Sequence, residues 1–159
     1  MLEKVEEKIG SITSSEFIEN TLLALFALFI STAIHELGHV LFAIVLGCPA
    51  GVAHVGLITG KSVVSDVCTN TQLILIALGG PLTAFLAGLL IWFLEKESKL
   101  RYLSVILMLF SSSLQLIPLN PLDGYQAIKF GLNPAIEIFL FLLVYSISAN
   151  IIIKAIKKS

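Results

Sequence analysis

Four apolar segments restrict the fold of this chain more than any other feature of its sequence. They comprise residues 21–46, 72–94, 100–119 and 134–156. Each contains about the 20 residues that a helix needs to cross about 30 Å of hydrocarbon. In addition, 57% of the 159 residues are hydrophobic and only 13% are charged, whereas about 25% of the residues in a soluble domain are charged. The sequence therefore predicts an all-α, multi-pass membrane protein with four transmembrane helices, and we expect it in the cell membrane.

Two shorter segments complete the predicted fold. Residues 1–20 are acidic and carry apolar side chains at helical spacing, which predicts an amphipathic helix on the membrane surface. Residues 51–70 are rich in β-branched side chains around the turn signal Thr59-Gly60-Lys61, which predicts a short membrane-associated β-hairpin after the first transmembrane helix. We expect residues 21–159 to form a single transmembrane domain. Gly79-Gly80-Pro81 is expected to interrupt its second helix.

The distribution of charge bears on partners and on orientation. The net charge is −1 and no basic cluster with interleaved aromatic residues occurs, so we expect the lipid bilayer and no nucleic acid as a partner. With four crossings, the two termini and the 95–101 connector share one side, and that side carries every lysine and arginine except Lys61 and Lys129. The positive-inside rule then places both termini in the cytoplasm.

The two cysteines, Cys48 and Cys68, lie between the first and second apolar segments. They form no C-x-x-C pair, and two cysteines alone do not make a disulfide framework. Two unrelated thiols are therefore expected. The alternative is a disulfide across this segment, which would require an oxidising compartment.

The first apolar segment contains three ionisable residues within five positions. They belong to the sequence His35-Glu36-Leu37-Gly38-His39. Histidines four residues apart project from one face of a helix, where both can bind one Zn²⁺ at about 2.0–2.1 Å. A charged residue at mid-membrane costs about 2.5–3.5 kcal/mol, so a chance cluster of buried polar residues is a poor explanation and a metal ion a good one. Glu36 is then within reach of a metal-bound water, and Gly38 lets a neighbouring helix approach.

A catalytic zinc ion usually has three protein ligands and one open position. Asp123 is the only acidic residue close to the end of the third apolar segment, beside prolines that break the helix. Broken backbone at membrane depth is tolerated where it lines a wet cavity, so Asp123 is the expected third ligand. The alternative is an ordinary turn in which Asp123 bonds its own backbone. Glu137, in the fourth segment, is a rival ligand, although acids in a first helical turn commonly serve the helix dipole.

Three motifs follow one another along the chain. They are His35-Glu36-Leu37-Gly38-His39, Gly79-Gly80-Pro81-Leu82 and Asn120-Pro121-Leu122-Asp123-Gly124. In this order they resemble the motifs of the site-2 protease family of membrane zinc metalloproteases, and residues 21–124 resemble its minimal catalytic core. The resemblance implies an intramembrane metalloendopeptidase that cleaves transmembrane protein substrates. It further implies that zinc is bound by His35, His39 and Asp123, and that Glu36 acts on the water.

The chain departs from the family pattern at three positions. Gln115 and Ala84 stand where the family often has Asn, and Tyr125 stands where it often has Gly. These changes leave the metal ligands untouched and concern substrate positioning. Gln115 still offers an amide, so we expect Gln115 and Asn120 to contact the substrate. The resemblance also implies an orientation opposite to the one that the charges indicate, which leaves the orientation open.

Three further alternatives remain at this stage. The hairpin could hold an unwound substrate by adding it as a strand, or its strands could pair only with each other. The serines at 111–113 could line a water path, but packing between helices is the commoner role of such residues. Finally, a non-enzymatic protein that carries metal or binds membrane helices would need no general base at Glu36.

Overall fold

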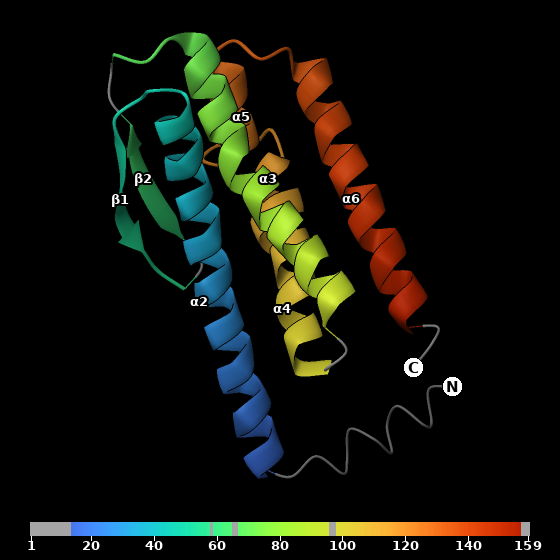
Figure 1. The fold of residues 1–159 in the computed structure, drawn as a ribbon. Coiled ribbons are helices and arrows are strands. Elements are labelled where there is room, and N and C mark those ends of the chain that lie inside the picture. Colours follow the sequence, from blue (N-terminus) through green and yellow to red (C-terminus); the bar gives the residue numbers. More distant parts are fainter. Residues whose placement is uncertain (1–13, 58, 65–66, 96–97, 157–159) are drawn as a thin grey trace.

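A computed structural model of the chain describes residues 14–57, 59–64, 67–95 and 98–156. Helices make up most of it, and one antiparallel hairpin lies beside the C-terminal half of the first helix (Figure 1). The start of that helix, the end of the second long helix, the start of the helix after it and the end of the last helix lie at one end of the molecule. The hairpin lies toward the other end, and this arrangement places the polar motifs there.

The first described helix, α2 (Ser14–Val45), is longer than the segment predicted to cross the membrane. It ends where Gly47 adopts a φ of +73°, a conformation that glycine adopts easily and that commonly terminates helices. The predicted boundary between residues 20 and 21 falls inside α2, so residues 14–20 continue the long helix instead of forming a separate element. The rest of the predicted amphipathic helix, residues 1–13, lies outside the described residues.

Among the described residues, three helices are long and apolar enough to cross a membrane. These spans are Phe17–Val45 in α2, Asn70–Leu94 in α3 and Pro134–Lys154 in α6 (Pro134–Ile156). The third apolar segment is different, because α4 (Ser98–Met108) passes into a π-helical turn, η1 (Leu109–Ser113), and a 3₁₀ turn, η2 (Leu114–Leu116). Pro118, which lacks an N–H group, lies two residues beyond the end of η2. The first, second and last predicted crossings therefore have helices of sufficient length. The crossing predicted for residues 100–119 stays a prediction.

The expected interruption of the second crossing is wrong, because α3 (Asn70–Leu94) continues through Pro81. Gly79, Gly80 and Pro81 are all buried. A Cβ on Gly38 would lie 2.7 Å from the carbonyl oxygen of Gly79 and equally close to Thr83, so α2 and α3 are in close contact here. This packing supports the helix at the proline, since an unwound segment would leave unpaired backbone groups in apolar surroundings.

The predicted hairpin is confirmed between α2 and α3. Strand β1 (Ala50–Val55) pairs with β2 (Gly60–Val64) in antiparallel register, from Ala50 opposite Val64 to Val55 opposite Gly60. Along β2, Lys61 and Val63 are exposed, whereas the residues between and beside them are half-buried. One face of β2 therefore lies against the helices.

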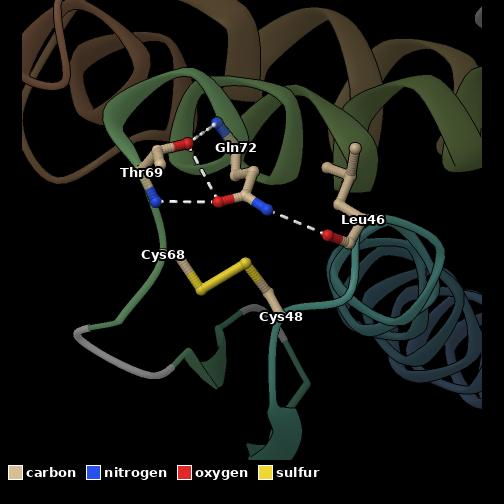
Figure 2. The surroundings of a disulfide bond; sticks show 5 residues. All are labelled: Leu46, Cys48, Cys68, Thr69 and Gln72. Atoms are coloured by element: carbon tan, nitrogen blue, oxygen red, sulfur yellow. Dashed lines mark hydrogen bonds between the residues drawn. A yellow bond between two sulfur atoms is a disulfide. The ribbon is translucent and has the colours of Figure 1, made fainter.

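The two ends of the hairpin segment are linked to each other by a disulfide, and the helices that flank it are linked by a hydrogen bond (Figure 2). Cys48 and Cys68 form a disulfide with a Cα–Cα distance of 5.9 Å, which is usual for such a bond. The expectation of two unrelated thiols is therefore wrong. Thr69 and Gln72 form a capping box at the start of α3, and the Gln72 amide donates to the Leu46 carbonyl over 2.9 Å. These contacts tie the end of α2 to the start of α3, with the hairpin between them.

Candidate metal centre

Three of the predicted site residues converge at one point. His35 and His39 lie on α2, and Asp123 begins the short helix α5 (Asp123–Lys129). The His35 Nε2 atom is 2.8 Å from Asp123 Oδ2 and 3.1 Å from His39 Nε2, and the third side of this triangle, from His39 Nε2 to Oδ2, measures 3.5 Å. Ligand atoms at tetrahedral positions around zinc are about 3.3 Å apart, given bonds of about 2.0–2.1 Å. The triangle therefore has the size of a zinc-binding site.

The two histidine rings are oriented by main-chain carbonyl groups. Nδ1 of His35 lies 2.6 Å from the Ser111 carbonyl oxygen, and Nδ1 of His39 lies 2.7 Å from that of Ile76. Because a carbonyl oxygen only accepts, each Nδ1 carries the hydrogen and donates it. A neutral ring in this tautomer has an unprotonated Nε2, which is the usual arrangement in a metal-ligating histidine.

The electron-rich atoms of the site face one another in buried surroundings. Asp123 Oδ2 is buried and accepts no hydrogen bond within the described part of the chain. An anionic oxygen and two imidazole lone pairs at this separation call for a cation. Two imidazoles and one carboxylate are a ligand set that suits zinc.

Gly80 provides the space beside the two Nε2 atoms. A Cβ at this position would collide with His39 Nε2 and would lie 2.8 Å from His35 Nε2. Sequence reasoning missed this role, because it interpreted the glycines and the proline as a break in the helix. The signal was present, since a glycine pair in an apolar segment also indicates close approach of another group.

Glu36 lies beside the metal centre and is buried, with 6% of its surface exposed. It lines a cleft of about 550 Å³ together with His39, Asp123 and residues of β2. It also lines a smaller cleft of about 230 Å³ that includes His35 and Gln115. The carboxylate is thus adjacent to the metal ligands and to space that can admit water or substrate.

The two predicted substrate residues are placed differently. Gln115 is half-buried and lines the smaller cleft with His35 and Glu36. Asn120 is exposed and lines neither of these two clefts. The structure therefore brings Gln115 to the metal centre and leaves Asn120 outside it.

The rival ligand, Glu137, is not part of the converging group. It is fully buried on α6, and a Cβ added to Gly124 would lie 2.6 Å from its Oε1 atom. Neither of its carboxylate oxygens has a hydrogen-bond partner among the described residues. The ligand atoms that lie within 4.8 Å of one another belong to His35, His39 and Asp123.

The serines of η1 take part in packing around the site. Ser111, Ser112 and Ser113 are buried. The hydroxyl of Ser111 is hydrogen-bonded to that of Ser31 on α2, one turn before His35. This contact joins η1 to α2 where the Ser111 carbonyl group accepts from His35, which agrees with the packing role. Ser111 also lines the smaller cleft, so the water path stays an alternative.

A family model described as Peptidase M50B-like matches residues 15–130 of the chain. The matched range is well over half of the sequence and contains α2 except for its first residue, the hairpin, α3 and every residue of the converging group. No curated protein and no solved structure gives a significant match.

Proposed function

The chain belongs to the Peptidase M50B-like group of the site-2 protease family and is a multi-pass membrane protein, and from this premise we propose that it is a zinc-dependent intramembrane protease. The proposed substrates are transmembrane proteins, cleaved at a peptide bond of the membrane-spanning segment. One observation supports this most strongly. Two Nε2 atoms and a carboxylate oxygen without a hydrogen-bond partner converge beside a buried glutamate.

The proposed chemistry assigns a separate task to each side chain. His35, His39 and Asp123 would hold the ion. A bound zinc ion lowers the pKa of water to about 7 and polarises the scissile carbonyl group. Glu36 accepts the proton of the attacking water and then delivers it to the nitrogen of the leaving amine. Gln115, which lines the same cleft as Glu36, would donate an amide hydrogen to the developing oxyanion.

The hairpin would supply the binding site for an unwound substrate. Peptide bonds in a transmembrane helix are hydrogen-bonded and shielded, so the substrate has to unwind before it is cleaved. The described sheet has two strands, so each strand has one edge without a strand partner. The hairpin borders the larger cleft, and an extended segment paired with its edge would run past Glu36.

The direct test is cleavage of a transmembrane peptide by the purified protein and by Glu36→Gln. Removal of a general base lowers turnover by about 10²–10⁴-fold. We expect such a loss in Glu36→Gln, with unchanged zinc content, because Glu36 is not among the ligands. Glu95→Gln makes the same chemical change at the end of α3, outside both clefts, and should leave cleavage unchanged.

The outcome also separates the protease from a non-enzymatic alternative. A protein that only carries metal or binds membrane helices has no use for a proton acceptor at this position. Zinc binding by the wild type without any cleavage, or equal activity in Glu36→Gln, would reject the protease proposal.

A further inference from the structure

The inner face of β2 reaches the glutamate that we propose as the general base. The Ser62 hydroxyl oxygen lies 2.5 Å from Glu36 Oε2 and 3.2 Å from the Glu36 carbonyl oxygen. A carboxylate and a carbonyl group only accept, so Ser62 is the donor. The shorter of the two distances identifies Oε2 as the main acceptor.

The two oxygens of the Glu36 carboxylate have different surroundings. Oε2 accepts from Ser62, and no described residue donates a hydrogen bond to Oε1. Oε1 lies against Gly60, where an added Cβ would collide with the carboxylate. Glu36 and Gly60 both line both clefts. One oxygen is therefore held by the hairpin, and the other is left for a water molecule or a substrate proton.

The position of Ser62 is set by the attachment of the hairpin to α2. Near the turn, the Thr32 hydroxyl lies 3.2 Å from the Leu57 carbonyl oxygen and 3.0 Å from the Leu28 carbonyl oxygen of its own helix, so it shares its hydrogen between the hairpin and α2. At the base, the disulfide between Cys48 and Cys68 closes the loop. Alternation along β2 then directs Gly60 and Ser62 toward α2, while Val63 remains exposed.

We propose that Ser62 is a positioning residue for Glu36, and that Gly60 leaves the space that Glu36 Oε1 needs to contact water or substrate. The hairpin is then part of the catalytic apparatus and not only a binding edge for substrate. This inference rests on the proposed protease function. The physical reason is geometric, because proton transfer requires the carboxylate at hydrogen-bonding distance from the reacting group, and a displacement of about 1 Å can lower the rate by about 10²-fold.

The test compares Ser62→Ala, Ser62→Thr and Val67→Ala in the full-length protein, with kcat, KM and zinc content measured for each. Ser62→Ala removes the donor, and we expect kcat to fall about tenfold or more while KM and zinc content stay within about twofold. Ser62→Thr keeps the hydroxyl on a strand that accepts β-branched residues, and should restore kcat to within about threefold of the wild type. Val67→Ala shortens an exposed side chain outside both strands and both clefts, and should leave kcat unchanged.

Gly60→Ala provides a second, independent change that leaves the hydroxyl in place. It crowds Oε1, so kcat should again fall at full zinc content. If Ser62→Ala also loses zinc, this variant decides the question: a lowered kcat supports the inference, and a normal kcat overturns it.

Four results would overturn the inference. They are a kcat of Ser62→Ala within twofold of the wild type, a change confined to KM, failure of Ser62→Thr to recover kcat, or an equal loss of kcat in Val67→Ala. Failure of the protease proposal itself looks different, because Glu36→Gln would then match the wild type. An inactive Glu36→Gln beside a fully active Ser62→Ala rejects only the role of Ser62.

Discussion

Each histidine of the metal centre donates through Nδ1 to a carbonyl group of a different segment, and this determines what its Nε2 atom can bind. The acceptor for His39 is Ile76 of α3, and the acceptor for His35 is Ser111 of η1. The ligand geometry therefore depends on residues whose side chains never touch the metal. Any change that moves α3 or η1 against α2 should weaken metal binding before it unfolds the protein.

Gly80→Ala adds one methyl group on α3 and tests how far metal binding depends on the packing of α3 against α2. The added methyl group would occupy the space beside both Nε2 atoms, and alanine is otherwise favourable in a helix. We expect metal affinity to fall by about 10–100-fold, the range seen for changes around metal ligands. Competition with a chelator measures it.

A matched control for this variant is Gly51→Ala. An added Cβ at that position meets nothing within 4 Å, so metal affinity should not change. Equal affinity in Gly80→Ala and the wild type would show that this crowding does not occur.

The sequence alone predicts some residues of the site more readily than others. The spacing of His35 and His39 determines a shared helix face, which local geometry alone predicts. The approach of Asp123 depends on how η2 and α5 pack against α3, and for this residue the family motif was the stronger guide. The contact of Ser62 with Glu36 was missed, because it depends on how the hairpin docks. Alternation along β2 was the available signal.

The helices are held together where small residues allow close approach. At Gly88 of α3, an added Cβ would lie 2.7 Å from Met108 Cγ and 3.0 Å from the Ser104 carbonyl oxygen of α4. The Ser104 hydroxyl in turn donates to the Gly88 carbonyl oxygen over 2.8 Å. Small residues and short polar contacts of this kind are the usual basis of helix association in a bilayer.

A larger side chain at Gly88 should separate α3 from α4. Gly88→Leu overfills this contact, and we expect the free energy of unfolding to fall by about 1–3 kcal/mol, as for other overpacked cores. Unfolding in detergent micelles, followed by circular dichroism, measures the change. Ala24→Leu places the same side chain on an exposed part of α2 and should leave stability unchanged. Identical unfolding curves for the two variants would contradict this account of the contact.

The elements themselves were predicted in part. The hairpin follows from composition and a turn signal, and it is present. The break at Pro81 was predicted from a rule for isolated helices, which packing against α2 overrides. The third crossing was read as one helix, because a hydrophobic pattern does not distinguish an α-helix from the π and 3₁₀ turns that follow α4.

Two features of the whole molecule agree on its orientation in the membrane. Arg101 and Lys154 lie near the end that holds the start of α2 and the end of α6 (Figure 1), and positive residues favour the cytoplasm. The disulfide between Cys48 and Cys68 joins the base of the hairpin beyond the C-terminal end of α2, and disulfides persist in oxidising compartments. Both features oppose the orientation that the family resemblance implied.

We therefore predict that the hairpin and the disulfide face away from the cytoplasm. In intact cells, a membrane-impermeant maleimide should label Cys48 and Cys68 only after treatment with an impermeant reductant. The variant with both cysteines replaced by serine is the control and should never be labelled. Labelling that requires permeabilised cells would place the hairpin in the cytoplasm.

The central claim is that one metal ion is bound by His35, His39 and Asp123, and zinc content per chain measures this most directly. Elemental analysis of the purified proteins should find about one zinc ion in the wild type and in Glu137→Ala, and close to none in Asp123→Ala. Absence of zinc from a folded wild type under zinc-replete conditions, or loss of zinc in Glu137→Ala but not in Asp123→Ala, would contradict the claim.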